Sequence, residues 1–286
     1  MGNNLKTVGL LALMTVLVFW LGYSLGGEGG LWIGIILAFG LNFVAYFFSD
    51  KIALAASRAK PADESQLPEV FSIVRNLTTH SGMPMPRMYV IESPQPNAFA
   101  TGRSPKHAAV AVTTGILAVM NREELTGVLA HELSHVQNRD ILISSVAAML
   151  AAALSIFGRM ALFMGGGRDE RGNPLAGIAA LLSIIIAPIA AMIIRMAISR
   201  AREYQADRSG AEITGQPLQL ASALAKLGAG TSRVPMQVNP AVSQLFIADP
   251  LKAFRGGRGR GMMSLFATHP PIEDRIERLR AMAAQV

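Results

Sequence analysis

The residues best suited to chemistry are two histidines and a glutamate in the sequence LTGVLAHELSHVQNRD at 125–140. His131 and His135 are four residues apart, so on an α-helix they share one face and both imidazoles can bind a single metal ion. Glu132 projects to the adjacent side of that turn, where its carboxylate can accept a proton from a water molecule on the metal. The HExxH spacing therefore indicates a hydrolytic zinc site, against the alternative of a helix whose polar face carries two histidines by chance.

A third metal ligand must come from elsewhere in the chain. The chain has no Cys, which leaves His, Asp and Glu as ligands. Two long apolar runs after His135 would return the chain to the membrane face that it left, at SRAREYQADRSG in 199–210. This arrangement predicts Glu203 as the third ligand and Asp207, one helical turn later, as the acceptor of a hydrogen bond from a ligating histidine. The alternative is that both are surface acids paired with neighbouring arginines.

The composition indicates a membrane protein. Of the 286 residues, 51% are hydrophobic and 16% are charged, which is too apolar for ordinary soluble domains. Four apolar runs have about the length of a transmembrane helix, namely 7–26, 31–48, 141–164 and 175–194. Because the linkers GGEGG and GGGRDERGNP are short, we expect two transmembrane hairpins, with Asn42 able to bond across to a neighbouring helix. A cleaved signal peptide is the alternative for the first run, and a pair of buried core helices for the last two.

The charge distribution predicts the orientation in the membrane. Lys51, Arg58 and Lys60 follow the second run, whereas the linker before it carries only Glu28. The positive-inside rule therefore places the amino terminus and the residues after 49 in the cytoplasm. The net charge of +7 favours contact with anionic lipid, and without a nucleic-acid-binding motif no nucleic-acid partner is expected. The basic sequence RGGRGRG at 255–261 is a candidate for lipid contact, or else a plain disordered loop.

Hydrophobic periodicity predicts a small α+β domain around the histidines. An amphipathic helix is expected over 61–80, starting at Pro61, and short strands are expected in RMYVIESP at 87–94 and in 97–117. Asn121 is the expected N-cap of the HExxH helix. Further amphipathic helices are expected over 216–228 and 272–282, the latter with its charges facing water.

The predicted fold class is an α-helical membrane protein with an α+β, zincin-like cytoplasmic metalloprotease domain and four transmembrane helices in two hairpins. Residues 1–50 would form the hairpin anchor and 51–140 the first part of the zincin domain, with its sheet and HExxH helix. Residues 141–198 would form the second hairpin. Residues 199–286 would complete the zincin domain and supply the third zinc ligand.

Several motifs together resemble a known family. HELSHVQNRD, two apolar spans, REYQADRSGAEITG, NAFATG upstream and LFATHPPIEDRIERLRAM near the end are similar to the HtpX-type membrane zinc metalloproteases, which are related to the CAAX-prenyl proteases. The resemblance covers essentially the whole chain. It implies a multi-pass endopeptidase of the cell inner membrane that binds one zinc ion, with its active site facing the cytoplasm. Its substrates would be misfolded membrane proteins, in a stress-response role in quality control.

The resemblance also implies roles for individual residues. It assigns zinc to His131, His135 and Glu203 and the general base to Glu132, as the spacing does. It adds Asn97 and His269, which in relatives are thought to position the substrate or stabilise the oxyanion. From the sequence alone, these two would be a turn residue and a loop histidine.

Two other functions compete with this one. One is an intramembrane zinc protease, which the charged residues around the HExxH motif disfavour. The other is a non-catalytic zinc-binding membrane scaffold, which would not need Glu132.

Overall fold

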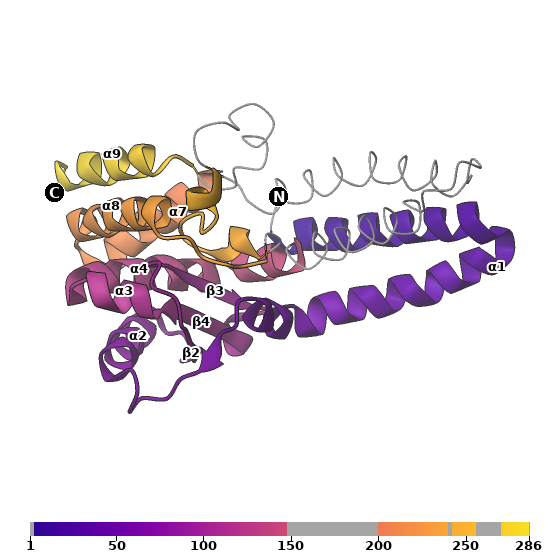
Figure 1. The fold of residues 1–286 in the computed structure, drawn as a ribbon, viewed down its shortest axis with the longest axis horizontal. Helices are drawn as coiled ribbons and strands as arrows, with labels where there is room; N and C mark the ends of the chain where they lie inside the picture. The colour runs from indigo at the N-terminus through magenta and orange to yellow at the C-terminus, as the bar shows by residue number, and fades with distance from the viewer. Residues whose placement is uncertain (1–2, 148–199, 240–241, 256–269, 286) are drawn as a thin grey trace.

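The computed structural model of the protein describes residues 3–147, 200–239, 242–255 and 270–285. These residues form a long apolar helical hairpin and, at its base, a domain in which helices are layered on a small sheet (Figure 1). Helices and strands are labelled as in Figure 1.

Helix α1 (Asn3–Ala56) forms the hairpin. Gly27 has a φ of +56°, in the left-handed region that glycine adopts at no steric cost. Figure 1 shows the two arms of α1 running side by side, away from the sheet. Asn42 Nδ2 donates a hydrogen bond to Thr15 Oγ1 at 2.7 Å between the arms. The predicted bond from Asn42 to a neighbouring helix is therefore confirmed.

The outer surface of α1 is strongly apolar. Trp32, Ile36 and Phe39 are 67%, 72% and 70% exposed. Among the described residues, Gly27–Ala56 is the one helical stretch long and apolar enough to cross a membrane, and Thr7–Trp20 is a shorter apolar helix. One candidate span is therefore found where four were predicted.

Most of the predicted second hairpin lies outside the described residues, which include only 141–147 of it. These residues are helical. Their side chains Leu142, Ile143 and Val146 pack against Leu10 and Met14 of α1. The chain after the HExxH helix thus runs along the first hairpin.

The predicted helix over 61–80 begins later than expected. Helix α2 spans Pro68–Ser81, and Pro61 instead belongs to the short strand β1 (Lys60–Pro61). Asp63 folds the intervening chain into a turn, because its carboxylate accepts hydrogen bonds from the backbone N–H groups of Ser65 and Gln66. Pro68 also disfavours a helical conformation at the residue before it. The acids after Pro61 therefore belong to a turn and not to a first helical turn.

The sheet has four strands in the order β1-β2-β4-β3. Strands β2 (Arg87–Ile91) and β4 (Ala108–Thr113) are parallel, and β3 (Ala98–Gly102) is antiparallel to β4, which it joins through the turn η1 (Pro105–His107). The strands predicted in 87–94 and 97–117 are confirmed, except that residues 114–117 are helical. Every residue of β3 and β4 is buried, as expected for strands covered on both faces. Strand β3 lies at the end of the strand order, so its outer edge is left for other partners.

The remaining helices are stacked on this sheet. Helix α3 (Thr114–Val119) leads into α4 (Arg122–Gln137), which lies against β3. Helix α7 (Arg200–Thr214) packs on α4, and α8 (Pro217–Arg233) packs on α4 and on α9 (Ile272–Ala283) (Figure 1). The short turns η2 (Ser243–Leu245) and η3 (Lys252–Arg255) lie between α8 and α9.

The sheet and these helices share one hydrophobic core. It includes Val74 of α2, Val110 of β4, Leu129 of α4 and Leu224 of α8, none of them more than 2% exposed. The segments before residue 148 and after residue 199 therefore fold into a single unit, which brings the HExxH helix next to α7.

Candidate metal centre

Helix α4 is held in position from its first turn. Asn121 caps it, accepting a hydrogen bond from the N–H of Glu124 while Glu124 accepts one from the N–H of Asn121, so the predicted N-cap is confirmed. The Glu124 carboxylate also accepts hydrogen bonds from Ser222 at 2.7 Å and Lys226 at 2.6 Å, both in α8. Burial tends to raise the pKa of Glu124, but these bonds outweigh burial and lower the pKa. This ionised carboxylate therefore fixes α4 against α8.

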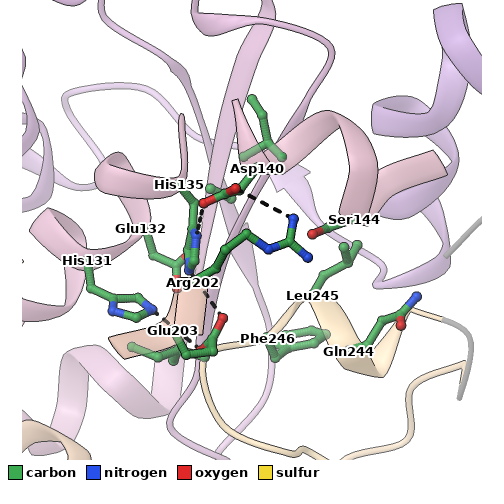
Figure 2. A pocket seen from close by; sticks show the side chains of 13 residues that line it. His131, Glu132, His135, Asp140, Ser144, Arg202, Glu203, Gln244, Leu245 and Phe246 are labelled. Atoms are coloured by element: carbon green, nitrogen blue, oxygen red, sulfur yellow. Dashed lines mark hydrogen bonds and ion pairs between the residues drawn. The ribbon is translucent and has the colours of Figure 1, made fainter. Parts of the chain in front are cut away.

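His131, His135 and Glu203 come together on the facing surfaces of α4 and α7. Each offers one donor atom, and these three atoms lie within 4.8 Å of one another. His135 Nε2 is 3.4 Å from Glu203 Oε1, and His131 Nε2 is 4.0 Å from Glu203 Oε2 (Figure 2). Ligands at 2.0–2.1 Å from a tetrahedral zinc ion are roughly 3.3 Å apart, so a small closure of this group would complete three corners of such a site.

Gly210 sets the close approach of α7 to α4. A Cβ atom at this position would lie 3.0 Å from the backbone nitrogen of His131 and 3.2 Å from its Cα. A larger residue would therefore push the two helices apart. Glu203 is on the same helix as Gly210. The distance of Glu203 from the two histidines therefore depends on residue 210 having no side chain.

Each of the two histidines is oriented by an aspartate on its other ring nitrogen. His131 Nδ1 is 3.0 Å from Asp207 Oδ1, and His135 Nδ1 is 3.0 Å from Asp140 Oδ2. An Nδ1–H donated to a carboxylate leaves Nε2 as the lone-pair donor for a metal ion, and this is the usual outer partner of a ligating histidine. Asp207 lies where it was predicted to lie. The partner of His135 was missed, although Asp140 follows it by only five residues.

The turn after α4 brings Asp140 back to His135. Arg139 has a φ of +58°, in the left-handed region that commonly ends helices. The next helix starts at residue 140. Arg202 is close on the other side, with its Nη1 3.5 Å from Asp140 Oδ1.

Arg275 is a buried member of the site that sequence reasoning missed. The charges of 272–282 were predicted to face water, which is wrong for Arg275, because it is 0% exposed. Its guanidinium donates two hydrogen bonds to Asp207 and one to the carbonyl of Ile247, and its Nη2 is 3.4 Å from His131 Nδ1. A signal was present in the sequence. Arg275 is four residues before the buried Leu279, on the face of α9 that packs inward.

Glu132 is buried between α4 and the edge of the sheet. It is 2% exposed and accepts a hydrogen bond from the backbone N–H of Ala100 in β3. Burial raises the pKa of Glu132 to about 7, and the nearby Glu203 carboxylate adds to the rise. A carboxylate with a pKa near neutrality can both take up and release a proton during a reaction.

The buried carboxylates of the site need positive charge to balance them. Burial alone would lower the pKa of His135, but Asp140, Glu203 and Glu132 outweigh burial and raise the pKa to about 10. In the metal-free protein His135 therefore carries a proton that partly balances these carboxylates. A divalent ion would supply this positive charge directly, so the set of donors fits a metal ion.

A narrow cavity of about 30 Å³ opens beside the donors. Its lining includes Glu132, Ala100, Arg202 and, from the chain before α9, the segment 244–247. Ile247 N–H donates to the Ala98 carbonyl at 3.0 Å, and Phe246 forms an antiparallel bridge with Phe99. This segment thus covers the first part of the outer edge of β3.

The structure places Asn97 away from this cavity. Asn97 is 0% exposed, its Nδ2 donates to the carbonyl of Ala248 at 2.8 Å and its Oδ1 accepts from the N–H of Ala98. Its amide thus holds the segment 244–248 on β3. His269 lies outside the described residues. The substrate-positioning roles of both residues stay predictions.

Comparison with known proteins identifies the family. The family model for peptidase family M48 matches residues 64–283, which include all the donors described above. The chain belongs to peptidase family M48. The predicted resemblance to HtpX-type metalloproteases is thereby confirmed.

Bacterial relatives named "Protease HtpX homolog" match over almost the full length. The protein from Desulfatibacillum aliphaticivorans is 48% identical over 100% of this chain and 91% of its own. The protein from Thermodesulfovibrio yellowstonii is 49% identical over 98% of this chain and 99% of its own.

The crystal structure of S. mikatae Ste24p shares the fold. The TM-score is 0.52 at 18% identity, and the match covers 97% of this chain and 65% of that longer one. This member of the M48 family thus has a Ste24p-like fold, mostly helical with a small sheet. The roles predicted for His131, Glu132, His135, Glu203 and Asp207 stay predictions at positions that the fold brings together.

Proposed function

We propose that this chain is a membrane-embedded, zinc-dependent endopeptidase that cleaves misfolded or damaged membrane proteins at the cytoplasmic face of the inner membrane. The observation that carries the proposal is the placement of Glu132 beside His131, His135 and Glu203. All four side chains line one cavity, and all but the half-buried His135 are buried. A pure metal-binding scaffold has no need of a further buried carboxylate with a pKa near 7 beside the three donors.

Zinc is the metal that the donors favour. Two imidazoles and one carboxylate are a common catalytic zinc set, and they leave a fourth position open. Bound there, zinc would supply a Lewis acid that polarises the scissile carbonyl and lowers the pKa of a water molecule. His131 and His135 would bind through Nε2, because Asp207 and Asp140 occupy the Nδ1 positions.

Glu132 performs the proton transfers of the proposed reaction. Its carboxylate takes the proton of the attacking water and later gives it to the leaving amine, as a general base and then a general acid. Its pKa of about 7 suits both steps at neutral pH. The N–H of Ala100 holds the carboxylate next to the edge of β3, where an extended peptide would lie.

The hairpin supports a membrane location. Large apolar side chains cover its outer surface, and such a surface needs lipid or protein to cover it. Lys51, Arg58 and Lys60 at its base favour a cytoplasmic position for the domain. A site at the base of the hairpin can reach polypeptide that leaves the bilayer, which favours membrane proteins as substrates.

The test is a zinc-dependent peptidase assay on the full chain purified in detergent. Glu132→Gln should keep the zinc content of the parent and lose activity by at least about 100-fold, because an amide cannot take the water proton. Glu123→Gln, an exposed position in the same helix, is the matched control and should match the parent. Turnover by Glu132→Gln would refute the mechanism.

The ligand variants test the metal assignment separately. His131→Ala, His135→Ala and Glu203→Ala should each lose zinc as well as activity, since each removes a direct bond. If Glu203→Ala binds zinc like the parent, the third ligand lies elsewhere in the chain.

A further inference from the structure

Gln244 is a buried polar side chain that the proposed chemistry does not use. It lies in η2, is 4% exposed, and lines the same cavity as the metal donors and Glu132. Within the described part of the chain, neither its Nε2 nor its Oε1 has a hydrogen-bond partner. In Figure 2 it lies at the opposite end of the lining from His131, with Leu245 and Phe246 beside it. Gln244 therefore offers an unused donor and an unused acceptor at the site.

A second buried glutamine shows the ordinary arrangement. Gln95 is 0% exposed, and its Nε2 donates to the carbonyls of Val234 and Pro250, the latter at 3.0 Å. Buried amides are nearly always bonded in this way, because an unbonded one carries an uncompensated desolvation cost. The two glutamines thus differ in that the described part of the chain supplies hydrogen-bond partners only for the side chain of Gln95.

The position of Gln244 relative to β3 indicates what could satisfy it. Phe246 and Ile247 cover the outer edge of β3 at Phe99 and Ala98. If this antiparallel pairing continued, Leu245 would lie opposite Ala100. The chain instead forms the turn η2 there and departs from the edge of β3 beside Ala100, which also lines the cavity. Gln244 therefore lies where the chain's own cover of β3 ends, and where an added strand would have to begin.

The size of the cavity also matters. A volume of about 30 Å³ holds a water molecule but not a peptide. Binding of a peptide must therefore widen the cavity. The Gln244 side chain can rotate during this widening without breaking any hydrogen bond within the described part of the chain.

We propose that Gln244 binds the main chain of the peptide substrate, at the end of the cavity away from His131. Its Nε2 donates to a substrate carbonyl and its Oε1 accepts from a substrate N–H. An extended main chain is the natural partner, because each of its residues presents its own C=O and N–H on the same side, whereas an apolar side chain presents neither. The inference rests on the proposed endopeptidase function and adds a substrate-positioning residue to it.

The experiment uses the zinc-loaded full chain and an internally quenched peptide built from a site that the parent cleaves in casein. Gln244→Met keeps the side-chain length and removes both polar atoms. We expect its KM to rise at least about tenfold with kcat within about twofold of the parent, because two hydrogen bonds to the substrate are lost and each typically contributes about two- to tenfold. Its thermal midpoint should not fall, because the Gln244 side chain makes no hydrogen bond within the described part of the chain.

Gln95→Met is the matched control, and we expect the opposite pattern. Its thermal midpoint should fall, because three hydrogen bonds within the domain are lost, while the KM of the folded protein stays that of the parent. In a Glu132→Gln background, the Kd of the uncleaved peptide should rise with Gln244→Met by the same factor as KM.

Two results would overturn the proposal. One is a Gln244→Met protein with the KM and Kd of its parent. The other is a protein that unfolds earlier, or fails to fold, like Gln95→Met, since its amide would then have a structural role. If the parent does not cleave casein, the endopeptidase function fails, and the Kd of intact unfolded casein, measured in place of the peptide, still decides whether Gln244 binds a main chain.

Discussion

Arg275 in α9 donates two hydrogen bonds to Asp207 in α7, at 2.7 Å from Nε and 2.6 Å from Nη2. Both side chains are buried, and Asp207 in turn lies 3.0 Å from His131. Burial would raise the pKa of Asp207, but the charge and hydrogen bonds of Arg275 outweigh burial and lower it to about 2. The ion pair thus keeps an aspartate charged where it orients a candidate metal ligand.

Removing Arg275 should be costly for the fold and for the metal site. Arg275→Met leaves the Asp207 carboxylate buried without its cation, which should lower the free energy of unfolding by about 3–5 kcal/mol. Arg280→Met is the control, because Arg280 is exposed on the same helix. Denaturant unfolding in detergent measures both. Equal stability of the two variants would contradict a structural role for the pair.

Asp207→Ala should weaken zinc binding by about 10–100-fold without abolishing it, the effect typical of losing the carboxylate behind a ligating histidine. Metal titration with a competing chelator measures this. Asp140→Ala should behave similarly through His135. A complete loss of zinc in either variant would make that aspartate a ligand itself.

Metal binding should release a proton at neutral pH. The pKa of His135 is raised to about 10 in the metal-free protein, so His135 is protonated at pH 7 and must lose its proton to bind zinc. Zinc affinity should therefore increase about tenfold per pH unit between pH 6 and 8. Calorimetry in buffers of different ionisation enthalpy counts the protons.

The Glu132→Gln protein is used for this measurement, so that the other group titrating near neutrality is absent. Release of about one proton is expected. If no proton is released, His135 is already neutral, and the neighbouring carboxylates do not raise its pKa.

The two arms of α1 should be coupled through Asn42 and Thr15. Their 2.7 Å hydrogen bond lies within the hairpin, where such bonds contribute about 0.6 kcal/mol and at most about 1.7. A double-mutant cycle with Asn42→Leu and Thr15→Val, measured by unfolding in bicelles, should give a coupling energy in this range. Additive effects would show that the arms do not depend on this bond.

The orientation in the membrane can be tested because the chain has no Cys. Single Cys residues at Glu28 and within 168–171 should react with an impermeant thiol reagent from outside the cell, whereas those at Lys60 and His107 should not. Labelling at 107 from outside would reverse the orientation. Protection of 168–171 alone would favour a buried hairpin over a spanning one.

Local pattern was enough to predict much of the site. The HExxH spacing, the capping residue Asn121 and the strands before α4 depend on neighbours in sequence, and each lies as predicted. Glu203 could be predicted because the two apolar runs after His135 were expected to bring the chain back to one membrane face. These features can be predicted from the periodicity and length of sequence segments alone.

The residues that sequence reasoning missed depend on packing between distant elements. The spacing of Arg275 from Leu279 pointed to the inward face of α9, but its buried partner became visible only once α9 was placed on α7 and α8, because a buried arginine is identified by its partner. Asp140 could be recognised as the partner of His135 only from the left-handed turn at Arg139, which brings it back to the histidine. The start of α2 at Pro68 depended on the turn that Asp63 forms, which competes with a helix over the same acids.

The place of Arg275 in the last helix has a consequence for the order of synthesis. The ribosome makes the histidines first, Glu203 later, and the cation that pairs with Asp207 last of these residues. A nascent chain can therefore hold all three candidate donors before Arg275 exists. Until then Asp207 lacks its ion pair, so the aspartate beside His131 is fixed only after Arg275 has been translated.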